Sequence, residues 1–284
     1  MSSSKKPASN ATPQPRFTDT VVPMASGEDV AVRVYGSKPQ AGTSIPLVLH
    51  FHGGAFIDGD LDSGCTVAGL LQAVGARVVS VAYPLSPEHP FPRPLEIGYA
   101  VLQWGYKHRT RLAGKGAPLY VAGEEAGGNL AAGVCLMARD QHHPPLAGQI
   151  LISPMLNPCA GTPSLRAVTG EATDCKWAQG WQKYLGCTHD ALHPYAVPAM
   201  AQRLAGLPPT LIMVGGGDPM CDEALAYAKR LKSAGLTVQE HAFVEATEWP
   251  DALLEPGSMD CPCEAQVLEQ LKIFFEASRC HTPN

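Results

Sequence analysis

The stretch VAGEEAGGNL, residues 121–130, decides the fold of this chain. A short apolar run leads into a Gly-x-x-x-Gly pentapeptide, Gly123 to Gly127, and a helical pattern follows. This frame is typical of a sharp strand-to-helix turn that lifts its central side chain above the edge of a sheet. The central residue of such turns is usually a serine nucleophile, but here it is Glu125. The chemistry of the chain depends on what a carboxylate does at that point.

Short apolar runs without polar alternation recur on both sides of this stretch, which is typical of strands buried on both faces. They cover residues 45–51, 77–83, 118–123, 149–155 and 210–216. Helical patterns lie between and after them, at about 93–107, 126–139, 222–235 and 263–278. The alternation predicts an α/β fold with a mostly parallel sheet, flanked by helices.

Two segments depart from this alternation. Residues 19–36 contain two strand patterns around a turn, which predicts an antiparallel hairpin at one sheet edge. Residues 157–198 are rich in Gly, Pro, Trp and Tyr, with one helical pattern near 176–186. We interpret this insertion, together with about 1–40, as a cap or lid on a single domain that spans 1–284.

Composition and charge exclude several classes of function. The 284 residues, 45% of them hydrophobic, suffice for one large globular domain. The net charge of −5 comes with no long basic run, so we expect no nucleic-acid partner. No apolar stretch is long enough for a membrane span, and the N-terminal segment lacks the apolar core of a signal peptide. We expect a cytoplasmic protein with about residues 1–15 disordered.

Cysteine usage points to a reducing compartment. The chain has nine scattered cysteines, an odd number. The one close pair, Cys261 and Cys263, lacks the spacing of a zinc or thioredoxin-like site. We therefore expect free thiols, no metal site and no cofactor.

Four motifs occur in the order of one known family. They are HFHGGAF (50–56), YPLSPEHPFP (83–92), GEEAGGNLAAG (123–133) and GDPMCDE (217–223). They look like the family's oxyanion loop, its Tyr-Arg-Leu-Ala-Pro-Glu-His segment, its nucleophile elbow and its acid-bearing motif. From about residue 18 to 278 the chain resembles the hormone-sensitive-lipase-like branch, of bacterial esterase family IV type, of the α/β-hydrolase superfamily. The resemblance implies an α/β-hydrolase fold.

The resemblance also implies where a catalytic triad would lie, in the chain order Ser, Asp, His. By position the acid is Asp218, Glu125 replaces the serine, and Glu248 in EATEWP (245–250) stands where the histidine belongs. With neither an attacking hydroxyl nor an imidazole to accept its proton, we expect no hydrolysis through an acyl-serine.

The oxyanion hole is made of main chain and does not depend on the serine. The resemblance assigns its N–H donors to Gly53, Gly54 and Ala126. Glu125 is long enough to place its own carboxylate in this hole and block it.

Three carboxylates would meet where the triad belongs. Two like charges about 4 Å apart repel by roughly 4 kcal/mol at an effective dielectric near 20, so at least one of Glu125, Asp218 and Glu248 should hold a proton near pH 7. An acid beside a base predicts cofactor-free acid/base chemistry on a small apolar molecule, such as isomerisation, cyclisation or a lyase step.

Two other functions stay open. The gibberellin receptors resemble the same branch with a damaged triad, which makes a non-catalytic protein that binds a small molecule the first alternative. The second is hydrolysis through a carboxylate nucleophile, as in epoxide hydrolases, with Glu248 as a weak substitute for the histidine that activates water.

Aromatic residues near the lid are candidate ligand contacts. Trp181 and Tyr195 lie in the insertion, and Trp249 follows Glu248. Trp177 and Tyr184 are further lid aromatics, and for all four aromatic residues of the insertion we favour packing within the lid over contact with a ligand. Members of this branch often dimerise, so the resemblance leaves a homodimer open.

Overall fold

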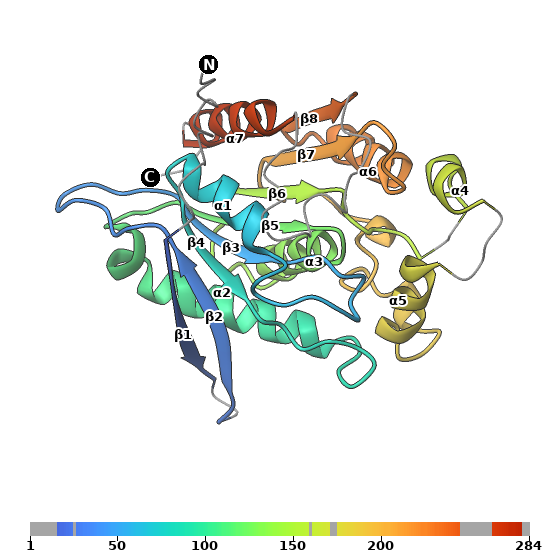
Figure 1. Cartoon of the computed structure of the whole chain (residues 1–284), viewed down its shortest axis with the longest axis horizontal. Helices are drawn as coiled ribbons and strands as arrows, with labels where there is room; N and C mark the ends of the chain where they lie inside the picture. The colour runs from blue at the N-terminus through green and yellow to red at the C-terminus, as the bar shows by residue number, and fades with distance from the viewer. Residues whose placement is uncertain (1–15, 25–26, 159–160, 171–174, 245–262, 280–284) are drawn as a thin grey trace, which may run out of the picture.

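The computed structural model describes residues 16–24, 27–158, 161–170, 175–244 and 263–279. Within these residues the strands form one eight-stranded sheet in the order β1-β2-β4-β3-β5-β6-β7-β8 (Figure 1). β1 pairs with β2, and β2 with β4, in antiparallel fashion, whereas the strands from β4 to β8 are parallel. The strand bounds are β1 (Phe17–Pro23), β2 (Asp29–Tyr35), β3 (Leu47–Phe51), β4 (Arg77–Val81), β5 (Leu119–Glu124), β6 (Gly148–Ile152), β7 (Thr210–Gly215) and β8 (Val238–Phe243).

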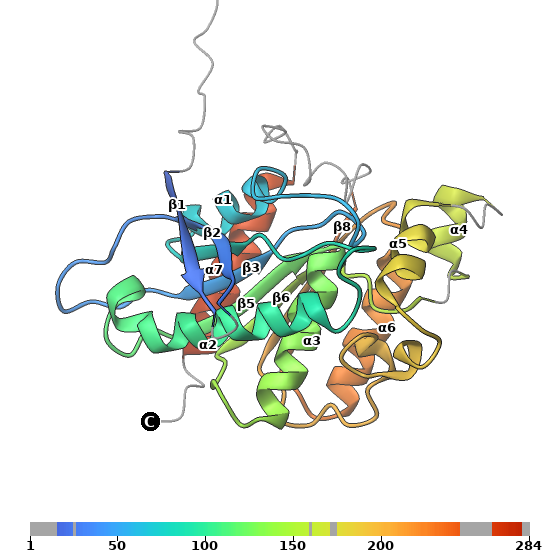
Figure 2. The same cartoon turned by 90° about the horizontal axis from the view of Figure 1, so that it is seen from below.

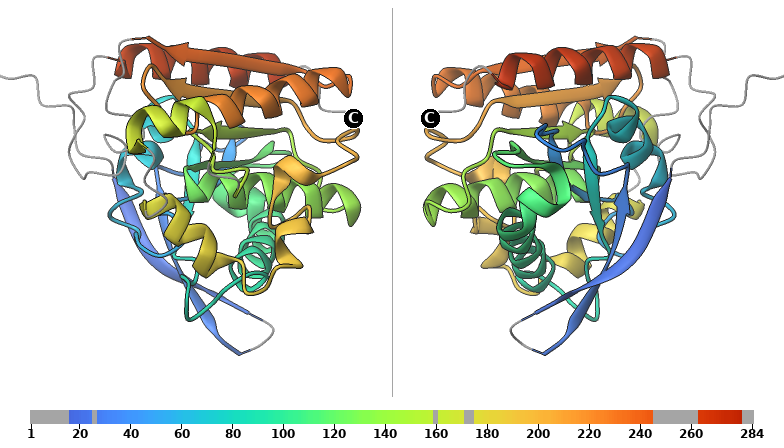
Figure 3. Two further views of the ribbon diagram at one scale, coloured as in Figure 1. Left: turned by 90° about the vertical axis from the view of Figure 1, so that its right-hand side faces the viewer. Right: turned by 90° about the vertical axis from the view of Figure 1, so that its left-hand side faces the viewer.

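Helices cover both faces of this sheet. Figure 2 shows α2 and α3 in front of the strands and α7 behind them. Two shorter helices, α4 and α5, lie beyond the carboxyl ends of the parallel strands, and they face the viewer in the left panel of Figure 3. The helix bounds are α1 (Cys65–Ala73), α2 (Arg93–Ala113), α3 (Ala126–Asp140), α4 (Pro163–Thr169), α5 (Lys176–Tyr184), α6 (Cys221–Ser233) and α7 (Glu264–Arg279), with 3₁₀ turns at Asp190–Leu192 and Pro198–Met200.

The side-chain alternation of β5 explains the two cores. Leu119 and Val121 point into the core shared with α2, α3 and α6, whereas Tyr120 and Ala122 point into the core shared with α1 and α7. Successive side chains of a strand point to opposite faces, so a strand between two helical layers must be apolar throughout. This is why the apolar runs lack polar alternation.

The fold predicted from the sequence is confirmed, including the edge hairpin at 19–36, which corresponds to β1 and β2. Of the segment expected to contribute to the cap, about 1–40, the described part contains this hairpin. The sequence did not predict α1, since that helix has nine residues and no side-chain cap at Gly64.

Candidate functional site

The carboxyl ends of three neighbouring parallel strands bring the candidate residues to one edge of the sheet. Glu125 follows β5, Ser153 follows β6, and Asp218 lies just beyond β7. Loops at this edge of an open α/β sheet form the usual place for a binding site. Two of the three carboxylates predicted from the sequence therefore share this edge.

Glu125 occupies the strained turn that the Gly-x-x-x-Gly frame predicts. Its φ of 53° and ψ of −116° are costly for any residue with a Cβ atom. A Cβ on Gly127 would lie 2.0 Å from the carbonyl oxygen of Phe51, and one on Gly123 would lie 2.2 Å from that of Gly127. Only glycine permits such approaches. The turn therefore forms although its central residue is a glutamate.

The carboxylate of Glu125 lies in the loop that follows β3. The amides of Gly54 and Ala55 donate to Oε2 at 2.6 and 3.2 Å. From α5, the indole N–H of Trp177 donates to Oε1 at 2.5 Å, and Lys176 Nζ lies 3.8 Å from the same oxygen. Glu125 is fully buried. Its side chain therefore fills the loop and connects it to α5.

This geometry corrects the set of main-chain donors expected from the sequence. The N–H of Gly53 donates to Glu124 Oε1 at 3.2 Å, so it does not point at Glu125. Glu124 is held in turn by His50, whose Nε2 lies 2.7 Å from Oε2. Ala55 takes the place expected for Gly53, because the backbone turns left-handed at Gly54 and Ala55, with φ of 112° and 50°. Ala126 begins α3 directly after Glu125, and its role as a donor stays a prediction.

Asp218 is held mainly by its own loop. Oδ1 accepts from the Met220 amide at 2.8 Å, and Oδ2 accepts from the Gly215 amide at 3.3 Å and from the Ser153 hydroxyl. Burial raises the pKa of the Asp218 carboxyl, and the charge of Glu125 adds to that rise, while these hydrogen bonds oppose it. The two carboxyls therefore act on each other electrostatically.

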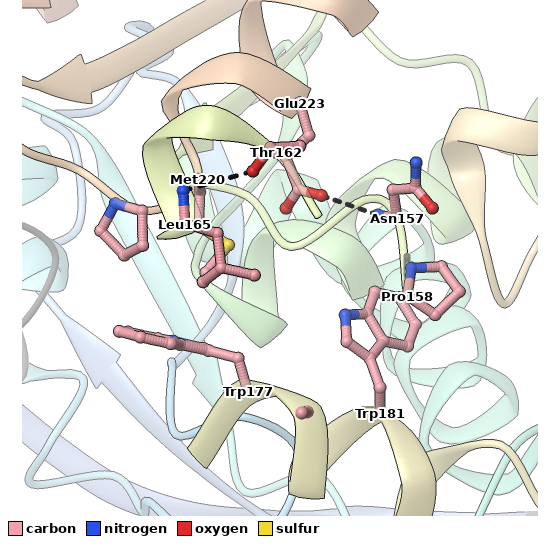
Figure 4. Close-up of a pocket in the computed structure, with 10 residues that line it drawn as sticks. Asn157, Pro158, Thr162, Leu165, Trp177, Trp181, Met220 and Glu223 are labelled. Carbon is pink, nitrogen blue, oxygen red and sulfur yellow. Dashed lines mark hydrogen bonds between the residues drawn. The ribbon is translucent and has the colours of Figure 1, made fainter. Parts of the chain in front are cut away.

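A narrow cleft lies between α5 and the loop that carries Asp218. Its lining residues are Asn157, Pro158, Thr162, Leu165, Trp177, Ala178, Trp181, Pro219, Met220 and Glu223. Figure 4 shows Trp177 and Trp181, both from α5, on one side and Glu223 with Thr162 on the other. Trp177 thus contacts both the cleft and Glu125.

Glu223 is a further buried carboxyl at this cleft. Its two oxygens accept from the amides of Leu156 and Asn157, both at 3.1 Å. Burial raises the pKa of Glu223 to about 8, against the opposing effect of these amides. A carboxylic acid with this pKa is mostly neutral at pH 7.

The remaining predicted ligand contacts fall in different places. Trp181 lines the cleft. Tyr195 does not, because its hydroxyl donates to Asp140 at the far end of α3, roughly 20 Å from the elbow at 1.5 Å per helical residue. Glu248 and Trp249 lie outside the described residues.

Several residues of the site were missed from the sequence, among them Ser153, Ala55, Glu223, Trp177 and Lys176. Glu223 had a signal, because it ends the GDPMCDE motif. Trp177 was noted only as a lid aromatic and Lys176 not at all, because nothing in a lid segment indicates which side chain will reach the elbow.

Three structural findings bear on the other sequence predictions. Cys263 is disulfide-bonded, which corrects the expectation of free thiols, whereas Cys65, Cys135, Cys175, Cys187 and Cys221 are free. Among the described residues, no group of three or more His, Cys, Asp and Glu side chains is placed to hold a metal ion. No helix in the described part of the chain is long and apolar enough to cross a membrane.

The family model described as "alpha/beta hydrolase fold" matches residues 48–247, which include the elbow and the Asp218 loop. The chain therefore belongs to the α/β-hydrolase family.

Individual relatives refine this assignment. The chain is 38% identical over 204 residues to Esterase LipI of Mycobacterium tuberculosis, with 69% of this chain and 62% of LipI covered. It is 33% identical to gibberellin receptor GID1A of Arabidopsis thaliana, with 74% of this chain and 64% of the receptor covered. The chain thus spans less than two thirds of either relative. The structure of a thermostable esterase from Pseudomonas putida superposes with a TM-score of 0.82 at 28% identity, covering 92% of this chain and 84% of that one.

These comparisons overturn the acid/base function predicted from the three carboxylates. Mycobacterial relatives that are 34–38% identical carry esterase or carboxylesterase names, and none of these names indicates isomerase, cyclase or lyase chemistry. The geometry gives a physical reason, since both oxygens of Glu125 accept hydrogen bonds from fixed N–H donors. The same contacts leave Glu125 badly placed as a carboxylate nucleophile.

Proposed function

We propose that this protein binds a small molecule in the cleft under its lid and does not hydrolyse esters. The observation that carries this proposal is the position of the Glu125 carboxylate, between the amides of Gly54 and Ala55. An esterase needs such donors free, because they must receive the oxyanion of the tetrahedral intermediate. A carboxylate already bound there excludes the substrate oxygen.

The sequence supports the same conclusion. Glu125 supplies no hydroxyl nucleophile, and the chain has no histidine between His241 and His281, the region where the family's catalytic histidine belongs. The replacement of both residues by glutamate is part of this proposal. The likeness to gibberellin receptors supports a binding role, because their name states that this scaffold serves recognition.

Ester hydrolysis, the activity in the names of the mycobacterial relatives, is the second candidate. The observation that favours it is Asp218, which is buried and held by two amides and a hydroxyl as the acid of a triad would be.

Two assays separate the candidates. We expect purified protein to show no burst with p-nitrophenyl butyrate and no covalent labelling by a fluorophosphonate, because both need an activated hydroxyl. The control is Ser153→Ala, which removes the Ser153 hydroxyl that is hydrogen-bonded to Asp218. Stoichiometric labelling of the wild type would support hydrolysis, and its loss in Ser153→Ala would identify the nucleophile.

A cytoplasmic location, a small-molecule partner and a homodimer stay predictions from the sequence. A single-domain protein of 1–284 with a lid at 157–198 is also our working proposal for the domain organisation.

A further inference from the structure

The first strand of the sheet has an open edge. β1 is the outermost strand, and within the described residues it pairs with β2 alone (Figure 1). Six of its seven residues are exposed. The hairpin that it forms with β2 projects from the body of the molecule at the bottom of both panels in Figure 3. An open edge strand is a template for pairing with another strand, so β1 can accept one.

The hydrogen bonds of this hairpin identify the free backbone groups. At one end of the hairpin, the N–H of Gly36 donates to the carbonyl oxygen of Arg16 at 3.0 Å. Hydrogen-bonded and non-hydrogen-bonded pairs alternate along an antiparallel ladder, so the even-numbered residues of β1 are the ones that bond to β2. The N–H and C=O groups of Phe17, Asp19 and Val21 therefore point to the open edge.

The side chains around Asp19 follow a nearly palindromic order. In FTDTV (17–21), a threonine stands next to Asp19 on each side, and Phe17 and Val21 stand at the two ends. Phe17 packs on the ring of Tyr35, with 5.5 Å between the ring centroids, but it is still 48% exposed, and Val21 is 51% exposed. Alternate side chains share one face of a strand, so Phe17, Asp19 and Val21 lie on the same face. The strand is therefore complementary to a copy of itself that runs in the opposite direction.

The charge of Asp19 is compensated within its own hairpin. Like charges directly opposite each other destabilise a strand pair, so a bare Asp19 would oppose pairing with its own copy. Arg33 on β2 donates to both carboxylate oxygens, at 2.7 and 3.0 Å, and its guanidinium also lies 4.0 Å from the ring centroid of Phe17. Arg33 is shared with Asp62, but that side chain is 71% exposed, so water screens its charge. Two copies would thus meet as two ion pairs.

We propose that β1 is a homodimer interface, in which it pairs antiparallel with β1 of a second copy about a two-fold axis at Asp19. In this register Phe17 lies opposite the partner's Val21, and the free backbone groups of residues 17, 19 and 21 exchange hydrogen bonds. The same patch is used on both copies, so the assembly closes as a dimer and joins two sheets into one. The proposal does not depend on the binding function, because the cleft lies between α5 and the Asp218 loop.

Sedimentation equilibrium of the full chain tests the dimer. The measurement covers about 1–200 μM, because strand pairing alone makes a small interface and small interfaces associate weakly. We expect the mass to rise from 30.0 kDa toward twice that value. Val21→Lys places an ammonium opposite Phe17 at two symmetric positions, so it should raise the dimer Kd by about tenfold or more. The matched control is Val244→Lys, at an 85% exposed valine directly after the other edge strand, β8, and it should leave the Kd unchanged.

Amide hydrogen exchange of the wild type, measured by NMR at both ends of this concentration range, tests the register. The amides of Phe17, Asp19 and Val21 should exchange rapidly in the dilute sample and more slowly in the concentrated one. The amides of Thr18 and Thr20 should be protected in both, because they bond to β2. This measurement needs no variant, so it decides the question even if Val21→Lys does not fold.

Three results would overturn the proposal. The first is a monomer over the whole concentration range. The second is a dimer that persists unchanged in Val21→Lys or is lost in Val244→Lys, because the interface would then lie elsewhere on the molecule. The third is exchange of the three odd-numbered amides that does not depend on concentration. None of these results bears on the binding function.

Discussion

Glu125 and Asp218 follow strands of the same sheet and are both buried, yet different parts of the chain hold them. Asp218 is bonded by the amides of its own loop and by Ser153 from the adjacent strand end. Glu125 is bonded by the loop after β3 and by helix α5. The part of the site around Asp218, the acid side, is thus formed mainly by its own loop. The part around Glu125, the elbow side, forms only when the turn after β5, the loop after β3 and α5 come together.

This difference shows which part of the site depends on segments that are distant in sequence. The loop of Asp218 contains the backbone amides that bind its carboxylate. We therefore expect this loop to form regardless of which residue occupies position 125. On the elbow side, the single carboxylate of Glu125 accepts hydrogen bonds both from the Gly54 amide and from the indole N–H of Trp177.

The largest effect is expected from Gly127→Ala, in the backbone under the elbow. The new Cβ would lie 2.0 Å from the carbonyl oxygen of Phe51, and a rigid backbone contact of this kind cannot relax cheaply. We expect a loss of about 3 kcal/mol or more in the free energy of unfolding, measured by urea denaturation. Gly105→Ala is the matched control, because a Cβ there meets nothing within 4 Å and alanine favours the α2 helix. Equal losses in both variants would show that the elbow backbone is not specially constrained.

The second largest effect is expected when the carboxylates of Glu125 and Asp218 are removed one at a time and the losses of stability are compared. Glu125→Ala leaves the N–H groups of Gly54, Ala55 and Trp177 without their acceptor, so we expect a loss of about 2–3 kcal/mol. Asp218→Asn should cost less, about 1–2 kcal/mol, because the loss of an unfavourable buried charge offsets part of the cost of leaving one of the Gly215 and Met220 N–H groups without its acceptor. Both are measured by urea denaturation at pH 7. A larger loss for Asp218→Asn would reverse the comparison between the two sides.

The third effect is a pH dependence from Glu223. Its pKa is about 8 in the folded protein, above the ordinary 4.5, so between these values the folded state binds a proton that the unfolded state has released. The stabilisation is fully present below about pH 4.5 and is lost as pH rises through 8, by at most about 1.4 kcal/mol per pH unit.

Denaturation of the wild type and Glu223→Gln between pH 5 and 8.5 checks this prediction. Stability of the wild type should fall with rising pH, and the variant should show a flatter profile because its amide does not titrate. We assign the pH dependence of stability that remains in the variant to Asp218, because its pKa is also raised in the folded state. Parallel profiles would mean that Glu223 is already ionised at pH 7.

The smallest effect is expected from Lys176→Gln. Its ammonium lies 3.8 Å from Glu125 Oε1, but the side chain is 43% exposed, so water screens the pair. We expect a change in Tm that corresponds to less than about 0.5 kcal/mol. Lys183→Gln, at an exposed position of the same helix, is the control. A loss of several kcal/mol in Lys176→Gln alone would show that the ion pair, rather than the Trp177 hydrogen bond, holds α5 against Glu125.

The sequence by itself determined the sheet, the elbow and the identity of the residue on it. Apolar runs and helical patterns each depend on neighbours a few residues away, which is why they could be recognised without a structure. The same holds for the Asp218 loop, whose partners Gly215 and Met220 lie within three residues. The function predicted from this information was wrong, because it treated the three carboxylates as free to exchange protons.

Only the tertiary structure decided where the Glu125 carboxylate goes. Trp177 lies 52 residues away in sequence and Gly54 lies 71 away, so no local pattern encodes either contact. The exchange of Gly53 for Ala55 among the donors depends on the left-handed backbone after Gly53, which a motif does not specify. The physical reason is common to both: hydrogen bonds between distant segments follow from how α5 and the loop after β3 pack on the sheet, and that packing is a property of the whole chain.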